Sequence, residues 1–212
     1  MIKPLNKFMP PIAVLQVPSS ENLNETLKRS LNELKSEGYS RDKFPTDDGD
    51  VFVSQFDLFK QSRKDGISEL SAIFKQVAQE VTAYFCGLSK SESLSLNYSF
   101  ESWFHFSYYG SSKSVHSHGE YSWAMVYYVD TGDIIDNKKN SGKIRLYNPN
   151  KPASVIPDFV NEHLQGAYSS SNITLSPRNG TLIVFPGYLE HEVLTYWGES
   201  PRVMVAANCK VT

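Results

Sequence analysis

Three of the five histidines in this 212-residue chain stand beside turn residues in a pattern that predicts a metal site. In the run HSHGE, the alternation of an extended strand points His116 and His118 to the same face, and Glu120 follows where the chain turns. His191 lies far downstream, after the turn signal Pro186-Gly187. Strand ends that are distant in sequence can converge at the mouth of a small barrel, so we expect these side chains to meet.

Two ligand sets fit this pattern. His118, Glu120 and His191 would supply two imidazoles and one carboxylate, the facial arrangement that leaves open positions on Fe(II) for O2 and a bidentate ligand. The alternative set is His116, His118 and His191, with Glu120 behind it. We favour the carboxylate set because a carboxylate lowers the net charge of the site and suits Fe(II).

Arg202 begins a strand that is apolar on both faces, in the run ESPRVMVAANCKV. A buried cation needs an anion as its partner. The planar guanidinium fork matches a carboxylate through two parallel hydrogen bonds, so Arg202 predicts a carboxylate-bearing ligand.

The elements that must position these residues fall into two parts. Leucines at three- and four-residue spacings predict an amphipathic helix over residues 22–38, and a second apolar stripe predicts a helix over residues 66–86. From residue 93 onward, eight short aromatic and β-branched runs alternate with turn signals, which is typical of an antiparallel sandwich or barrel. We expect a single domain over residues 1–212, with a helical part at about 1–90 and a β-barrel core at about 93–212.

The composition excludes several classes. The formal net charge is −2 and basic residues form no stripe, so nucleic acid is not an expected partner. No apolar stretch is long enough for a membrane helix, and the N-terminus does not read as a signal peptide, which predicts a cytoplasmic protein. Cys86 and Cys209 both lie in apolar surroundings and are expected to be buried free thiols.

At several points the sequence resembles a known family, the 2-oxoglutarate- and Fe(II)-dependent oxygenases of bacteria and marine phages, which are distantly similar to prolyl hydroxylases. The resemblance rests on the runs IAVLQVP, VFVSQFDLF, SWFHFSYYGSSKSVHSH, SWAMVYYV, GKIRLYNP and GTLIVFPGYLEHEV, with Arg202 after them. It implies a mainly β, α+β fold: a double-stranded β-helix of jelly-roll or cupin-like type, with N-terminal helices packed outside. For a phage-encoded member, the compartment would be the host cytoplasm.

The resemblance also implies roles for residues. Fe(II) would be the metal, 2-oxoglutarate the co-substrate held by Arg202, and O2 the oxidant. The spacing from Gly110 to His116 is similar to that of prolyl-hydroxylase-like members, which makes His116 the first ligand and puts His118 where a carboxylate is usual. Many relatives carry Ser or Thr where this chain has Met204, so one hydrogen bond to the co-substrate is expected either to be missing or to come from a tyrosine, with Tyr108 and Tyr127 as candidates.

The implied activity is hydroxylation of a peptidyl residue, proline-like, or of a small molecule, with release of succinate and CO2. Loops 111–121 and 150–175 are expected to select the substrate. One rival is a cupin-type metal enzyme, which has no need for Arg202, and another is a degenerate barrel that acts as a binding or structural module. His105 and His163 are expected to be a strand residue and a loop residue without a role at the metal.

Overall fold

Two antiparallel sheets form the body of the molecule in the computed structural model, which describes residues 9–41, 49–133, 137–150, 155, 158–169 and 171–212. The six-stranded sheet has the order β1-β8-β5-β10-β3-β2, and the four-stranded sheet has the order β4-β9-β6-β7. The strands are β1 (Ala13–Gln16), β2 (Val51–Val53), β3 (Tyr98–Ser107), β4 (Lys113–His116), β5 (Trp123–Asp130), β6 (Ile144–Leu146), β7 (Ile173–Leu175), β8 (Thr181–Pro186), β9 (His191–Val193) and β10 (Arg202–Val211). This architecture confirms the expected mainly β, double-stranded β-helix fold.

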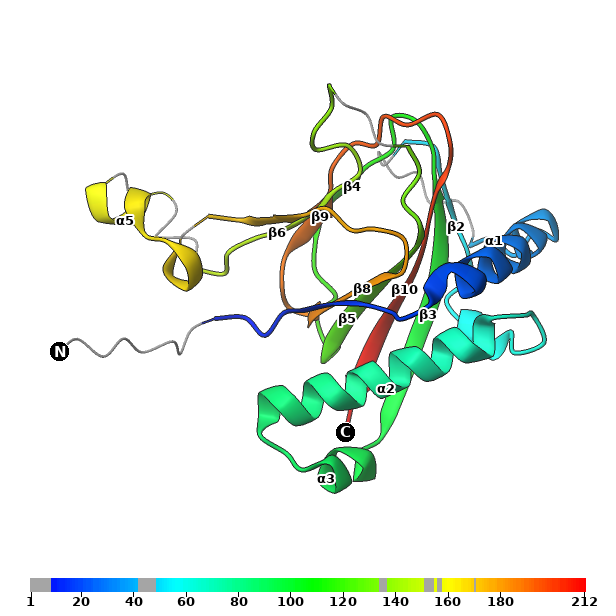
Figure 1. Cartoon of the computed structure of the whole chain (residues 1–212), viewed down its shortest axis with the longest axis horizontal. Helices are drawn as coiled ribbons and strands as arrows, with labels where there is room; N and C mark the ends of the chain where they lie inside the picture. The colour runs from blue at the N-terminus through cyan, green and yellow to red at the C-terminus, as the bar shows by residue number, and fades with distance from the viewer. Residues whose placement is uncertain (1–8, 42–48, 134–136, 151–154, 156–157, 170) are drawn as a thin grey trace.

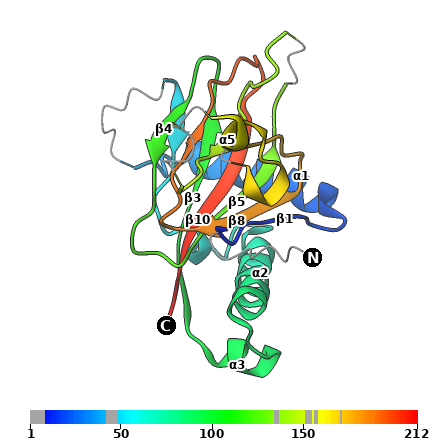
Figure 2. The ribbon, with the colours of Figure 1, turned by 90° about the vertical axis from the view of Figure 1, so that its left-hand side faces the viewer.

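Helices cover the outer face of the six-stranded sheet (Figures 1 and 2). The helical elements are α1 (Ser20–Ser36), η1 (Leu58–Lys60), α2 (Ile67–Cys86), α3 (Lys90–Ser95), α5 (Phe159–His163) and η2 (Gly166–Tyr168). The leucine stripe of α1 and the apolar stripe of α2 pack with the outward-facing residues of β5 and β10 into one core. Both long helices were expected from the sequence, and α2 ends at Gly87, which adopts the left-handed conformation that favours glycine.

The N-terminal part also contributes two strands, so it is not helical throughout. β1 pairs with β8 at one edge of the large sheet, and β2 pairs with β3 at the other edge. Each pairing joins segments far apart in the sequence, and short apolar runs such as AVLQ do not reveal such partners by themselves.

A projecting arm extends from the small sheet between β6 and β7 and carries α5 and η2 (Figure 1). Both helical elements of the arm lie within residues 150–175, one of the two loops expected to select the substrate. Phe159 and Val160 of α5 are exposed, and the ring of Phe159 stacks on His163 at 4.2 Å between centroids. His163 therefore belongs to the arm.

The two cysteines differ in exposure. Cys209 is buried in the core, whereas Cys86 is exposed, so the expectation of two buried thiols was wrong for Cys86. The last turn of α2 leaves the core, as the 81% exposure of Tyr84 shows, and Cys86 is the last residue of that turn. None of the helices that the structure describes has both the length and the apolar character needed to cross a membrane.

Candidate active site

Three histidines converge where the small sheet meets the cavity between the sheets. His116 ends β4 and His191 begins β9, and the two residues are direct partners in the antiparallel pairing of these strands. Their ring centroids lie 4.2 Å apart, and the Nε2 atom of His118 lies 3.3 Å from the Nε2 atom of His191. One ligand atom from each of the three rings lies within 4.8 Å of the others, which is close enough for all three to reach one ion.

A tight backbone approach holds His118 in place. The His118 backbone N–H donates to the carbonyl oxygen of Gly187, at 2.7 Å. A Cβ atom at position 187 would lie 2.2 Å from the carbonyl oxygen of Tyr121, so only glycine permits the turn after β8 to pass this close. The Pro186-Gly187 signal therefore sets the distance between the two halves of the cluster.

The cluster is arranged to bind a metal through neutral rings. Nδ1 of His116 lies 2.7 Å from the Ser114 carbonyl oxygen, and Nδ1 of His191 lies 3.0 Å from that of Leu189. A carbonyl oxygen only accepts, so Nδ1–H donates in both rings, which makes Nε2 the ring atom that can ligate a metal. Burial, followed by the nearby His116, lowers the pKa of His191 to about 3 and that of His118 to about 4. Both rings are therefore uncharged near pH 7, as metal ligation requires.

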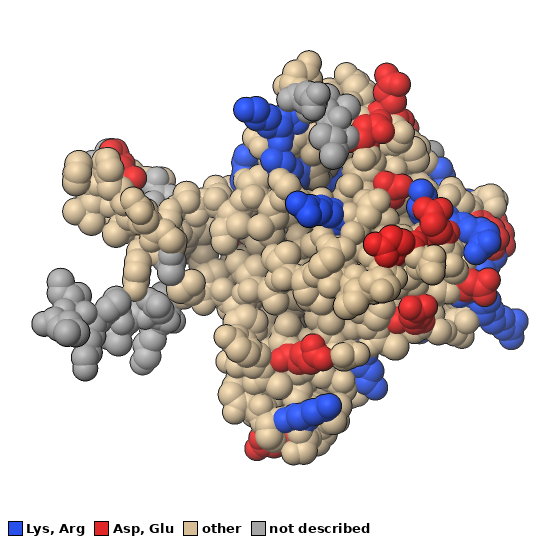
Figure 3. Space-filling view, viewed as in Figure 1, with Lys and Arg blue, Asp and Glu red and all other residues tan. Residues whose placement is uncertain are grey.

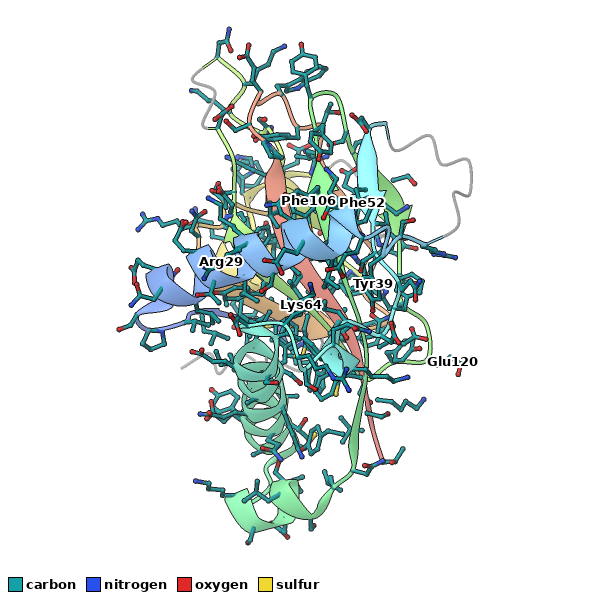
Figure 4. All side chains as sticks on the ribbon, turned by 90° about the vertical axis from the view of Figure 1, so that its right-hand side faces the viewer. Arg29, Tyr39, Phe52, Lys64, Phe106 and Glu120 are labelled. Atoms are coloured by element: carbon teal, nitrogen blue, oxygen red, sulfur yellow. The ribbon has the colours of Figure 1, made fainter. Side chains whose placement is uncertain are left out.

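Glu120 lies outside this group. Its residue is exposed, and Figure 4 shows it at the margin of the molecule. β4 ends at His116, and Gly119 adopts a left-handed conformation (φ 53°), so the chain turns before it reaches Glu120. Among the described residues, the structure brings together the three-histidine set, whereas we had favoured the set that contains Glu120.

Arg202 is a buried cation for which the described residues provide no anion. Its residue is 2% exposed, and within the described part of the chain Nη1 and Nη2 have no hydrogen-bond partner. The guanidinium carbon lies 5.1 Å from the ring centroid of Tyr128. Burial lowers the pKa of Arg202, because a charged guanidinium is less stable away from water than in it. Such a group needs a carboxylate or another anion from outside the chain.

One cavity of about 550 Å³ connects these two features. Alternate residues of β10 face it, and each is paired with a cavity-lining residue of β3. These pairs are Arg202 with Ser107, Met204 with His105, Ala206 with Trp103, and Asn208 with Glu101. The opposite wall comes from the small sheet and includes all three clustered histidines.

Residues 101–208, more than half of the chain, match the profile of a family described as "Putative 2OG-Fe(II) oxygenase". The chain belongs to this family. No curated protein matches it significantly. Its fold is similar to that of a prolyl-4-hydroxylase from Pseudomonas putida, with a TM-score of 0.64 at 14% identity over 95% of this chain and 92% of the other.

Two further solved structures share the fold. A prolyl hydroxylase from Trichoplax adhaerens, in complex with a hypoxia-inducible-factor peptide fragment, matches with a TM-score of 0.64 at 13% identity, covering 95% of this chain and 84% of the other. HygX from Streptomyces hygroscopicus, with nickel and 2-oxoglutarate bound, matches with a TM-score of 0.61 at 10% identity over 95% and 83%.

In this oxygenase, neither tyrosine expected beside Arg202 lines the cavity. Tyr127 faces the helices, where its hydroxyl donates to Asn24 Oδ1 at 2.6 Å. The Tyr108 hydroxyl accepts a hydrogen bond from the Nζ atom of Lys35. The tyrosine at the guanidinium is Tyr128, one residue after Tyr127, because successive strand residues point to opposite faces.

The sequence interpretation also missed other cavity residues of the oxygenase. Tyr128 Oη and Ser111 Oγ are buried and, in the described ranges, make no hydrogen bond. Asn208 and Trp103 line the other half of the cavity, and His105, expected to be an ordinary strand residue, lines it too. The period-two alternation that begins at Arg202 carried the signal for Asn208, because residues 202, 204, 206 and 208 must share a face.

Proposed function

We propose that this oxygenase holds Fe(II) on His116, His118 and His191 and binds 2-oxoglutarate with its distal carboxylate on Arg202. The observation that supports this proposal is that a cluster of three imidazoles and a buried, unpaired guanidinium share one cavity in the described structure. The two groups match the two ends of a 2-oxo acid that carries a second carboxylate.

The histidine cluster fits iron by its chemistry. Imidazole is a suitable ligand for Fe, and three ligands leave coordination positions open for a co-substrate and O2. Bound iron would supply the activation of O2 and the oxidation of 2-oxoglutarate to succinate and CO2. The backbone carbonyls that accept from His116 and His191 fix the orientation of both rings before the metal arrives.

The Arg202 end fits a carboxylate by its donors. The guanidinium offers a planar fork, and the buried hydroxyls of Tyr128 and Ser111 make no hydrogen bond with any described residue. Tyr128 is the β5 partner of Met204, the position where a hydroxyl was expected to be missing. We assign to Tyr128 the hydrogen bond that Met204 cannot make.

Apolar residues between the two ends keep water away from the reacting groups. Val126, Ile144, Val193 and Met204 line the cavity beside the histidines and Arg202. A dry cavity strengthens the pairing of Arg202 with an anion and suppresses side reactions with water. The chain's contribution is therefore orientation, charge pairing and exclusion of solvent.

The reaction class we propose is hydroxylation of a peptidyl residue, proline-like, or of a small molecule. The likeness to two prolyl hydroxylases, one with a bound peptide fragment, supports the peptidyl alternative. Two free cysteines agree with a reducing compartment, and we propose the cytoplasm. Acidic and basic side chains are interspersed on the face shown in Figure 3, which supports a substrate other than nucleic acid.

The direct test is an anaerobic titration of the metal-free protein with Fe(II) and then 2-oxoglutarate, followed by the weak visible charge-transfer band of the complex. Admission of O2 should then release succinate even without a primary substrate. A protein that binds iron but gives no band and no succinate would be a degenerate barrel, and the proposed function would fail.

A further inference from the structure

The half of the cavity beyond the histidines is unused by the proposed iron and co-substrate. Arg202 and Asn208 mark the two ends of the inward face of β10, about 20 Å apart at the usual rise of a strand. The ring of His118 packs against Trp103, at 6.0 Å between centroids, and Trp103 is paired with Ala206. The histidine cluster therefore lies between the two ends, and the Asn208 end is open to a second molecule.

The side-chain oxygen of Asn208 is a buried acceptor to which no described residue donates. Its residue is 6% exposed, and among the residues that the structure describes Oδ1 finds no hydrogen-bond partner. Its pairing neighbours are Glu101 on β3 and Ala124 on β5. Leaving a buried carbonyl oxygen without a donor destabilises a fold, so its retention on an otherwise packed strand points to a ligand that donates.

Glu101 adds a second acceptor at the same end. It lines the cavity, is exposed, and together with burial raises the pKa of the neighbouring Tyr121 to about 12. A carboxylate is acceptor-only and has several lone-pair sites, so Glu101 can accept from a ligand. An amide oxygen and a carboxylate side by side favour a group with more than one N–H.

Aromatic side chains form the wall beside these acceptors. The rings of Phe56 and Trp103 meet edge to face at 4.9 Å, and Ala206 opposite Trp103 is small. The two rings are nearly perpendicular, so they form a corner, and the small Ala206 leaves space in front of Trp103. The guanidinium of Arg41 lies over the Phe56 ring, 4.8 Å from its centroid. Aromatic faces attract cationic and N–H-bearing groups in addition to apolar ones.

We propose that Asn208 and Glu101 bind an N–H group of the primary substrate, an amine or an amide, while Trp103 and Phe56 pack against its apolar part. Asn208 is thus a residue that positions the substrate and determines specificity. The inference rests on the proposed function, since the proposed function places 2-oxoglutarate in the Arg202 half of the same cavity.

The test compares matched small molecules in the holoenzyme. Each proteinogenic amino acid, its N-acetyl amide and its deaminated carboxylic acid of equal carbon skeleton are added with Fe(II), 2-oxoglutarate and O2. Succinate release is measured together with a mass gain of one oxygen in the added compound. We expect stimulation by at least one N–H-bearing series and none by the deaminated acids.

A pair of variants separates recognition from folding. Asn208→Leu should raise the KM of the best compound roughly 10- to 100-fold, the loss expected from one or two hydrogen bonds to a desolvated group. Asn24→Leu, which removes a buried asparagine on the helix-covered face, should leave that KM unchanged. Asn208→Asp keeps an acceptor for the N–H group, so it should raise the KM less than Asn208→Leu does.

The outcomes are distinguishable from failure of the proposed function, since iron and 2-oxoglutarate binding are measured first without any substrate. With both intact, the inference is overturned if no N–H compound stimulates, if a deaminated acid stimulates equally, or if Asn208→Leu leaves KM unchanged.

Discussion

The two faces of the six-stranded sheet treat buried polar groups in opposite ways. On the helix-covered face such groups are paired: the Tyr127 hydroxyl with Asn24, the Trp123 indole N–H with Thr82, and the Tyr98 hydroxyl with Ser93. On the cavity face, Arg202, Tyr128 and Asn208 present atoms that have no partner among the described residues. The same strands build both faces, so the difference reflects what each face is for.

An unsatisfied buried polar group costs about 1–3 kcal/mol. A face that exists only to hold the protein together pairs its polar groups, and a face that awaits ligands leaves them open. The comparison therefore makes each variant on the two faces informative: a change on the helix-covered face should affect stability, and a change on the cavity face should affect ligands.

The largest expected effect belongs to His191→Ala, which should abolish iron binding because it removes a ligand that is already oriented by Leu189. The matched control is His163→Ala, an exposed histidine of the projecting arm. Iron content of the purified proteins, measured by metal analysis, checks this. Unchanged iron in His191→Ala would contradict the metal assignment.

His116→Ala and Glu120→Ala decide between the two ligand sets. His116→Ala should lose iron as His191→Ala does, whereas Glu120→Ala should stay within a few-fold of the parent affinity because the residue is exposed and outside the cluster. The reverse result would restore the carboxylate set.

Next in size is Arg202→Leu, which should retain iron but lose 2-oxoglutarate. Removing one side of a buried charge pair costs about 3–5 kcal/mol, or roughly two to three and a half decades in affinity. Arg202→Lys should fall between, since it keeps the charge without the fork. The measurement is the anaerobic 2-oxoglutarate titration, with the exposed Arg29→Leu on α1 (Figure 4) as control.

The same variant also tests the comparison through stability. Without ligand, the parent buries a guanidinium that has no anion among the described residues. Arg202→Leu should therefore unfold at an equal or higher denaturant concentration than the parent. A large loss of stability in the ligand-free state would mean that the cavity face is a structural face after all.

Substitutions of the two neighbouring tyrosines on β5 should have smaller effects than Arg202→Leu, one on stability and the other on 2-oxoglutarate affinity. Tyr127→Phe leaves Asn24 Oδ1 without its donor and should lower the free energy of unfolding by about 1–3 kcal/mol, with 2-oxoglutarate affinity unchanged. Tyr128→Phe should leave stability equal or higher and weaken 2-oxoglutarate by about 0.5–1.5 kcal/mol, a factor of roughly two to thirteen. Denaturant unfolding and the anaerobic titration measure the two quantities, and identical profiles for both variants would remove the distinction between the faces.

These neighbours also show how far sequence reasoning reached. The spacing of His116, His118 and His191 was sufficient to bring them together, because strand alternation and a Pro-Gly turn are local signals. Arg202 was found because a permanent charge in an apolar strand is anomalous by itself.

The failures have a common physical cause. Tyr127 was chosen over Tyr128 because alternation alone does not say which of two successive residues faces the cavity. Pairing with distant strands decides that, and here β5 pairs with β10. This pairing also shifts register at Val203/Met204. The exposed position of Glu120 was not anticipated because the left-handed conformation of Gly119 does not show in an alternation pattern. β1 was missed because its partner lies at the other end of the chain.

The smallest expected effect on the protein concerns its two thiols, which report how closed the helix-covered face is. Cys209 directs its side chain into the core formed with α1 and α2, and burial raises the pKa of its thiol to about 12. The thiolate is the reactive form, so at pH 8 a thiol reagent should modify the exposed Cys86 and leave Cys209 intact in the native protein. Both should react in denaturant. Mass spectrometry of the labelled protein counts the modified thiols, and Cys86→Ser provides the control that should take up no label when native. Rapid labelling of Cys209 in the native protein would show that the helices open readily. The helix-covered face would then differ less from the cavity face in its access to small molecules.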